Sequence, residues 1–190
     1  MKNITTILLL FCFSIVFAQE KNEVEKRVKK KQVPESAKEW MKDAYEKKSR
    51  VKWYFQTDGT KKAYEAKLFW KNNKHSVEFD TSGEIVNIEI LIDQNEIKTH
   101  AKQKIQQYFD ENYSKFSIKK IQIQYTGDGD DLEDLIDEDE HDEDLTINYE
   151  IEFYGKNEDA DELWEGLFDQ DGKLLEKRIV NIKATDNLDY

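Results

Sequence analysis

Hydrophobic positions follow a helical spacing early in the chain and then a strand-like alternation. Ala37, Trp40, Met41, Ala44 and Tyr45 fall at i, i+3, i+4, i+7 and i+8, which predicts an amphipathic helix. Stretches in which apolar and polar residues alternate follow as far as residue 92, and a period of two predicts strands. Residues 33–92 are therefore predicted to form one helix and four short strands.

The same order of patterns returns in the second half of the chain. Ile97, Ala101, Ile105 and Phe109 share one face of a second predicted helix, and alternating segments follow it. The motif Phe-Asp-x-x-Gly at 79–83 also recurs at 168–172. Segment 93–183 is predicted to be a second unit, followed by a C-terminal tail at 184–190. The predicted fold class is α+β, with two tandem helix-plus-four-strand units forming one antiparallel sheet and helices on one face.

The alternation also divides the residues of the predicted sheet between a face under the helices and an open face. Antiparallel sheets often leave one face in water. Tyr54, Phe69 and Tyr154 fall on the predicted open face, among polar residues that include Glu65, Gln122, Glu150 and Glu152. Aromatic side chains beside polar groups are typical of interfaces, so these three are the candidate partner-binding residues. Scattered exposed aromatic residues are also normal on a protein surface, and this alternative stays open.

The N-terminal residues 1–18 have the pattern of a secretory signal peptide. Lys2 precedes an apolar run that ends in small residues, and cleavage is predicted after Ala18. The run is shorter than the roughly 20 residues of a spanning helix, which disfavours a membrane anchor. Cys12 follows the bulky Phe11, which disfavours a lipoprotein. We expect a periplasmic or secreted protein without membrane insertion after cleavage, and without a cysteine, since the chain has one.

The charge of the chain is concentrated in one segment. The formal net charge is −12, and twelve acidic residues lie within 128–144. This balance argues against nucleic-acid binding, which needs a basic surface. Because like charges repel, segment 127–145 is predicted to be a long, extended acidic loop between two strands. Segment 19–32 is rich in charge and lacks aromatic residues, so it is predicted to be a disordered charged linker.

The acidic loop is also the candidate cation site. Ca²⁺ takes carboxylate oxygens, but neither 128–131 nor 169–172 has the ligand spacing of an EF-hand. Any Ca²⁺ binding there is expected to be weak and without fixed geometry, and a solubilising loop is the alternative. The candidate ligands are Asp128, Asp130, Asp131, Asp137 and Asp139.

The sequence contains no recognisable catalytic pattern. His75, His100 and His141 form no metal-binding pair, and the chain lacks G-x-S-x-G, P-loop and G-x-G-x-x-G motifs. We predict that the protein is not an enzyme and requires no cofactor.

The order of motifs resembles a known family. Val33-Pro34 opens the first helix, YEA occupies 64–66, VEFDTSGEI occupies 77–85, and the second unit contains YEIEF and FDQDGKLL. This pattern resembles the PepSY-like periplasmic proteins of Bacteroidetes, whose fold is similar to that of beta-lactamase inhibitory protein. The resemblance covers about residues 33–182 and implies an antiparallel sheet with an open concave face and a non-enzymatic role. The acidic segment departs from the compact hairpins of that family.

Two functions follow as hypotheses. The first is an exported, non-catalytic protein-binding module, with inhibition of a peptidase or other secreted enzyme as one form of it. Its unknown partner is expected to be basic, because the acidic loop would steer such a partner. The alternative is binding or buffering of Ca²⁺ or another cation through residues 128–144.

Overall fold

The computed structural model describes residues 19–45, 50–138, 144–158 and 160–181. The predicted signal peptide and the predicted C-terminal tail lie outside these residues. Within them, ten strands form one sheet with the order β1-β10-β9-β8-β7-β6-β5-β4-β3-β2. The strands are β1 (Gln19–Lys21), β2 (Glu23–Val28), β3 (Lys52–Asp58), β4 (Lys61–Trp70), β5 (Asn73–Phe79), β6 (Ile85–Leu91), β7 (Lys115–Thr126), β8 (Thr146–Lys156), β9 (Asp161–Asp169) and β10 (Leu174–Val180).

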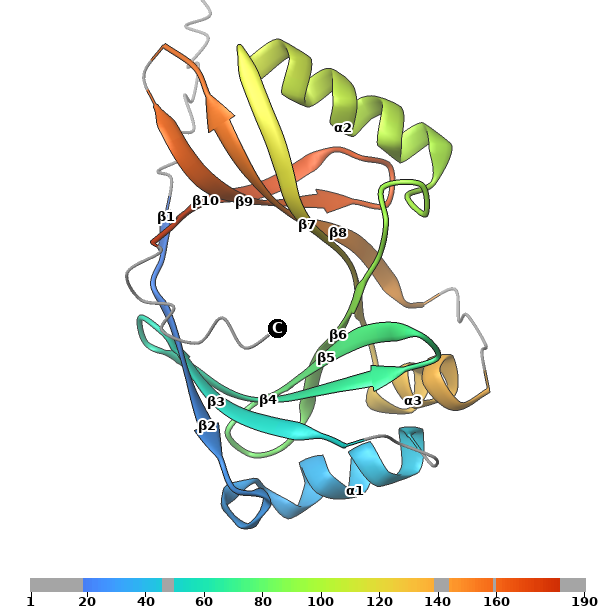
Figure 1. Ribbon diagram of the computed structural model, residues 1–190. Coiled ribbons are helices and arrows are strands. Elements are labelled where there is room, and N and C mark those ends of the chain that lie inside the picture. Colours follow the sequence, from blue (N-terminus) through green and yellow to red (C-terminus); the bar gives the residue numbers. More distant parts are fainter. Residues whose placement is uncertain (1–18, 46–49, 139–143, 159, 182–190) are drawn as a thin grey trace, which may run out of the picture.

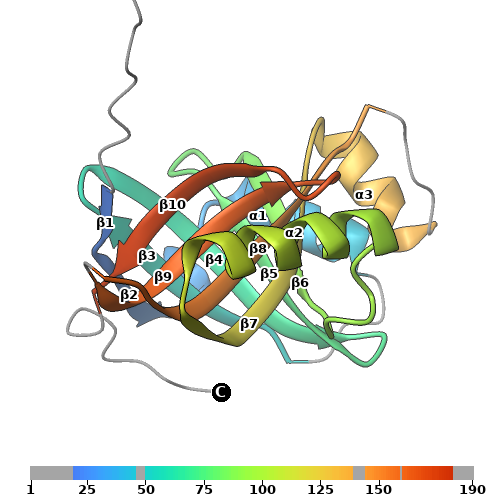
Figure 2. The same cartoon turned by 90° about the horizontal axis from the view of Figure 1, so that it is seen from above.

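The sheet curls until it is a nearly closed, barrel-like layer (Figure 1; Figure 2). All its neighbouring strands are antiparallel except β1 and β10, which pair in parallel over three residues. The α+β class is confirmed, and the prediction of a purely antiparallel sheet is corrected by this one pair.

Three α-helices lie outside the curled sheet in the described part of the chain (Figure 1). They are α1 (Glu35–Ala44), α2 (Thr99–Asn112) and α3 (Gly129–Asp137), and a short 3₁₀ helix spans Lys30–Gln32. One apolar core forms under α1 and α3 against β3–β6, and a second forms under α2 against β7–β10. The helices therefore share the outer face of the sheet, as the alternation predicted.

The Phe-Asp-x-x-Gly motif closes a tight turn in each half of the molecule. Asp80 Oδ1 accepts the backbone N–H groups of residues 82, 83 and 84, and Asp169 Oδ1 accepts those of residues 171 and 173. Gly83 and Gly172 have φ of +94° and +84°, where a side chain would be strained. A Cβ on Gly172 would also meet the Ala101 carbonyl oxygen of α2 at 2.4 Å, so this glycine permits close packing of turn and helix.

The prediction of an extended acidic loop is wrong for residues 129–137, which form helix α3. The Asp128 side chain caps the helix by accepting the Asp130 N–H. Acidic residues in the first turn also favour the helix, because its N-terminus is the positive end of the dipole. Leu132, Leu135 and Ile136 are buried on the side that packs against α1 and the first core. Three apolar residues at helical spacing thus dock the segment despite its charge.

The prediction of a disordered linker is wrong for residues 19–28, which we call the N-terminal strap. Its strand β1 pairs with β10 at one edge of the sheet, and β2 pairs with β3 at the other edge. Between them, the Asn22 N–H donates to Asp58 Oδ1 at 3.0 Å. The strap is ordered because it satisfies the backbone groups that both edge strands would otherwise leave unpaired. It links the two edges and so completes the curled layer.

Candidate functional site

The inner face of the sheet carries a network of charged and amide side chains. The predicted open face is therefore wrong in one respect, because the curled sheet and the strap enclose it. Glu165 and Gln122 are only 4% and 8% exposed to solvent. Burying so many polar groups is favourable only when they are paired, so the network must be nearly complete. Its glutamates are Glu23, Glu25, Glu65, Glu78, Glu89, Glu150, Glu152 and Glu165.

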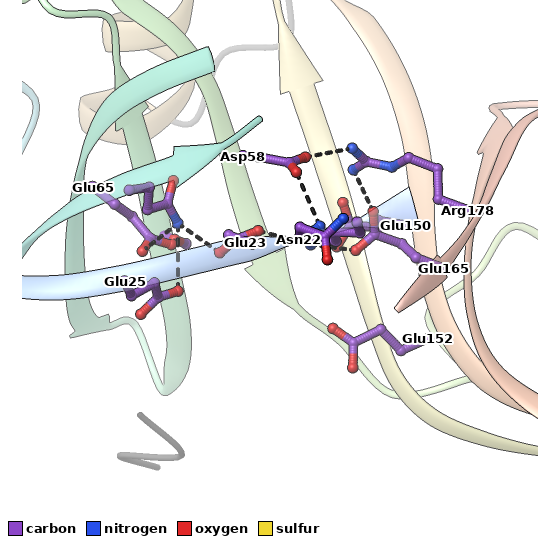
Figure 3. Close-up of polar contacts among 12 residues, drawn as sticks. Asn22, Glu23, Glu25, Asp58, Glu65, Glu150, Glu152, Glu165 and Arg178 are labelled. Carbon is purple, nitrogen blue, oxygen red and sulfur yellow. Dashed lines mark hydrogen bonds and ion pairs between the residues drawn. The ribbon is translucent and has the colours of Figure 1, made fainter. Parts of the chain in front are cut away.

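At the strap, Glu165 is held by two cationic groups (Figure 3). Lys21 of the strap donates to its Oε2, and Arg178 of β10 donates to its Oε1 at 2.6 Å. Arg178 also donates to Asp58 Oδ2 at 3.0 Å, so it bridges the two edges of the sheet that the strap joins. Burial alone would raise the pKa of Glu165, but Lys21 and Arg178 outweigh it and lower the pKa to about 2. Glu165 is therefore a firmly ionised anchor for the strap.

A second cluster forms where the other part of the strap meets β3 and β4 (Figure 3). Glu65 accepts hydrogen bonds from Ser76 and from Gln56, the latter at 2.8 Å. Lys67 lies 3.2 Å from Glu65 and 2.7 Å from Glu25 of the strap. Burial raises the pKa of Glu65 to about 7, although Lys67 opposes the shift. Its charge is therefore sensitive to pH near neutrality, in contrast to that of Glu165.

Between these clusters, three carboxylates converge. Oxygen atoms of Glu150, Glu152 and Glu165 all lie within 4.8 Å of one another. Lys120 lies 2.6 Å from Glu152 and 3.5 Å from Glu150. Burial raises the pKa of Glu150, and the nearby Glu165 adds to this shift. The pKa of Glu89 is raised in the same way, first by burial and then by the charge of Glu150. We call the carboxylates of Glu89, Glu150, Glu152 and Glu165, with the cationic groups near them, the middle cluster. Its acidic groups outnumber the cationic groups that could pair with them.

The predicted contact residues Tyr54, Phe69 and Tyr154 do not share one environment. Tyr54 is buried to 2% exposure, with Lys67 Nζ 5.1 Å from its ring centre, because its position on β3 lies within the enclosed face. Phe69 and Tyr154 remain 53% and 40% exposed. Both lie near the carboxyl ends of their strands, β4 and β8, which run in the same direction through the sheet. Tyr54 is therefore not a surface contact residue, whereas the other two are at one open end.

A groove lies at this same end, beside the carboxyl end of β6 and the first half of β7. It is lined by residues that include Asn73, Leu91, Asp93, Lys119 and Lys120. Lys119 Nζ sits 5.0 Å from the centre of the Tyr154 ring. We call the end of the sheet that carries Phe69, Tyr154 and this groove the aromatic end.

The predicted cation ligands of the acidic segment are dispersed. Asp128 is the cap of α3, Asp130 and Asp137 are exposed, and Asp131 is half-buried. Asp139 lies outside the described residues. Within the described ranges, the carboxylates close enough to share an ion are Glu150, Glu152 and Glu165, and not those of this segment.

The described histidines have structural surroundings. His75 is buried and shares a 3.0 Å hydrogen bond between its Nδ1 and the Tyr45 hydroxyl. Burial, followed by the charge of Lys71, lowers the pKa of His75 to about 4, so the ring is neutral at pH 7. His100 is exposed on α2, and His141 lies outside the described residues.

Sequence reasoning found part of the site. Glu65, Gln122, Glu150 and Glu152 were placed on one polar face by alternation alone. Lys21, Glu165 and Arg178 were missed, because their roles depend on the strap pairing with both edges. The strap offers only a slight signal of this kind, because a single apolar residue, Val24, lies between Glu23 and Glu25.

Comparisons with known proteins identify the fold. No family model matches the sequence, and a search of curated proteins gives no match. A DUF2874 family protein from Bacteroides ovatus has a TM-score of 0.51 at 14% identity, covering 83% of this chain and 92% of that one. A DUF2874 family protein from Bacteroides uniformis has a TM-score of 0.51 at 13% identity, covering 77% of this chain and 89% of that one.

A third solved structure shares the fold. It is a protein of Bacteroides eggerthii named as "putative periplasmic", with a TM-score of 0.50 at 12% identity, covering 77% of this chain and 88% of that one. The expected resemblance to periplasmic Bacteroides proteins is thus confirmed at the level of the fold. None of the described helices combines the length and apolar character needed to cross a membrane.

Proposed function

We propose that this is an exported, non-catalytic binding protein whose partner surface is the aromatic end. The observation that carries the proposal is the exposure of Phe69 and Tyr154, while most large apolar side chains of the described residues are buried. Exposed aromatic rings rimmed by charged groups are typical of interface anchors. The fold shared with the "putative periplasmic" protein of Bacteroides eggerthii supports the cellular setting.

The two rings occupy equivalent places in the two units. Phe69 follows Tyr64 by five residues, and Tyr154 follows Tyr149 by five, in the repeated Tyr-Glu-x pattern. Their predecessors Leu68 and Phe153 are both buried in the cores. We infer that the two helix-plus-four-strand units are repeats of one module, each providing one ring to the surface. The repeated Asp-x-x-Gly turns support the same inference.

The aromatic end exposes charges of both signs, because Asp93 and Glu96 line the groove and Asp161 pairs with Lys156. Lys115, Lys119 and Lys156 are exposed there, on β7 and β8. The exposed carboxylates of α3 lie beyond the opposite ends of those strands, since α3 connects β7 to β8. A basic partner, as expected from composition, would instead be drawn to α3. Inhibition of a secreted peptidase or other enzyme is one form that such binding would take.

Site-specific photocrosslinking tests the proposal. A photoreactive phenylalanine analogue at position 69 or 154 is expected to capture the same defined protein from periplasmic extract. Phe69→Ala combined with Tyr154→Ala should abolish capture by the purified partner. Leu175→Ala is the matched control, since Leu175 is also 53% exposed but lies at the start of β10, at the opposite end. Equal binding by the double variant and the control would overturn the proposal.

A further inference from the structure

The middle cluster of the inner face has more acidic than basic groups. Glu89, Glu150, Glu152 and Glu165 are its carboxylates, and Lys21, Lys120 and Arg178 are the cationic groups near them. Arg178 also forms an ion pair with Asp58, and Lys21 also forms one with Glu23. Even when every cationic group is assigned here, one negative charge is left without compensation. A buried excess charge is costly unless a proton or a cation neutralises it.

Gln122 supplies a separate indication of what is missing. Its side-chain carbonyl oxygen Oε1 is buried and has no hydrogen-bond donor among the described residues. Gln122 stands directly opposite Glu150 in the β7–β8 ladder, and side chains of directly paired residues project from the same face. An unpaired buried carbonyl oxygen costs about 1–3 kcal/mol. It therefore calls for a positive or hydrogen-donating group at this point.

The geometry points to a divalent-cation site on the inner face, with Glu150 and the Gln122 Oε1 atom as its central ligands. Glu152 and Glu165 offer further oxygens within 4.8 Å of those of Glu150. Carboxylate and amide oxygens are the ligands preferred by Ca²⁺ and Mg²⁺, and the set contains no nitrogen or sulfur ligand. The site is distinct from the acidic segment 128–144 and independent of partner binding at the aromatic end.

The groove of the aromatic end lies next to this site, and a proton competes with the ion for it. The groove of the aromatic end reaches Leu91 and Lys120, which pair with Gln122 and Glu152 across the ladders. A proton on Glu150 is the competitor, since a protonated carboxyl could donate to Gln122 Oε1. Because the proton and the ion exclude each other, cation affinity should rise with pH. Lys120 can keep its 2.6 Å contact with Glu152 while Glu150 turns to the ion.

Calorimetry on chelator-treated full-length mature protein, with Ca²⁺ and Mg²⁺ in separate titrations, tests the inference. We expect saturable binding of one ion per chain, with a dissociation constant at or below about 1 mM, typical of extracellular sites. The heat should fall as pH is lowered from 8 to 5. Glu150→Gln should weaken binding at least tenfold, Gln122→Met should weaken it, and Gln122→Glu should strengthen it. Preference for Ca²⁺ or Mg²⁺ then identifies the ion.

A matched control separates this site from the acidic segment. Asp130→Asn combined with Asp134→Asn neutralises exposed carboxylates of α3 and should leave binding unchanged. Circular dichroism and thermal unfolding show whether each variant is folded. Absence of binding by the wild-type protein would show that a proton compensates the cluster and would overturn the inference. So would binding that persists in folded Glu150→Gln, or that is lost in the α3 variant alone.

Discussion

The outer and inner faces of the curled sheet are two interiors of different kinds, built from alternate residues of the same strands. On the outer face, aromatic and aliphatic side chains pack under the helices, as where Phe109 stacks on Phe116 with ring centres 4.7 Å apart. On the inner face, glutamates meet lysine, arginine and amide groups. Apolar packing is non-directional and contributes most of the stability. The inner network is directional, so it fixes how the strap joins the sheet edges, at a desolvation cost.

The largest expected effect tests the outer face. Phe109 is fully buried, and its ring also contacts Phe153 at a centre distance of 4.7 Å. Phe109→Ala should lower the free energy of unfolding by about 3–5 kcal/mol, because it removes apolar contacts and leaves a cavity. Urea denaturation measures it. Phe69→Ala is the control and should cost less than about 1 kcal/mol, because Phe69 is mostly exposed. Similar losses in both variants would contradict the described outer core.

The second effect tests the inner face at the strap. Lys21→Met leaves the buried carboxylate of Glu165 with Arg178 as its remaining cationic contact, and should cost about 2–4 kcal/mol at pH 7. The folded pKa of Glu165 is lowered to about 2, below its ordinary 4.5. Its ionised form therefore stabilises the protein above pH 4.5, and this contribution is lost as pH falls towards 2.

The difference between Lys21→Met and wild type should therefore shrink as the medium is acidified from pH 5 to pH 2. Chemical denaturation at a series of pH values measures it. A difference that stays constant across this range would show that the loss arises from packing of the lysine chain and not from the ion pair.

The third effect compares two glycines with positive φ. Gly59 and Gly172 have φ of +59° and +84°, but a Cβ would meet nothing within 4 Å at Gly59, whereas at Gly172 it would meet Ala101 of α2. Both Gly→Ala variants should lose about 1 kcal/mol from backbone strain. Gly172→Ala should lose a further 1–2 kcal/mol, roughly, from overpacking against the helix. Thermal unfolding of the two variants gives the difference, and equal losses would show that α2 can retreat from the turn.

The smallest effect again tests the inner face. Burial raises the pKa of Glu65 to about 7 in the folded protein, above its ordinary 4.5. The folded state therefore holds a proton that the unfolded state releases between pH 4.5 and 7, and wild-type stability falls as pH rises through this window. Glu65→Gln carries no such charge and should gain about 2 kcal/mol over wild type at pH 8 relative to pH 5, since one pKa unit corresponds to about 1.4 kcal/mol. A pH-independent difference would contradict the buried charge.

Alternation was sufficient to predict which residues share each face, but not the curvature of the sheet. The helices at 35–44 and 99–112 and the strands around Tyr64 and Tyr149 follow from periods of 3.6 and two, which local sequence determines. Whether a polar face meets water or another part of the same sheet depends on twist and on closure by distant segments. The face that carries Glu65 and Glu150 was therefore identified correctly, while its enclosure was not.

Charge content misled the prediction at two segments. In the strap, charged residues outnumber apolar ones, yet the edge strands β3 and β10 supply hydrogen-bond partners that the local sequence does not reveal. In the acidic segment, Leu132, Leu135 and Ile136 have the spacing of a helix. The extended loop was predicted instead because their acidic neighbours repel one another. Both segments are ordered by partners far away along the chain.

The strap also has a consequence for the order of assembly. Lys21 and Glu165 are separated by 144 positions, and Asn22 and Asn181 by 159. The first strand of the described chain therefore pairs with the sheet only after the last strand has been synthesised. Contacts between such distant residues form slowly, because closing a long loop of chain costs entropy before the contact repays it. We expect amide hydrogen exchange to show β1 joining β10 among the last steps of folding, once both halves are already in place.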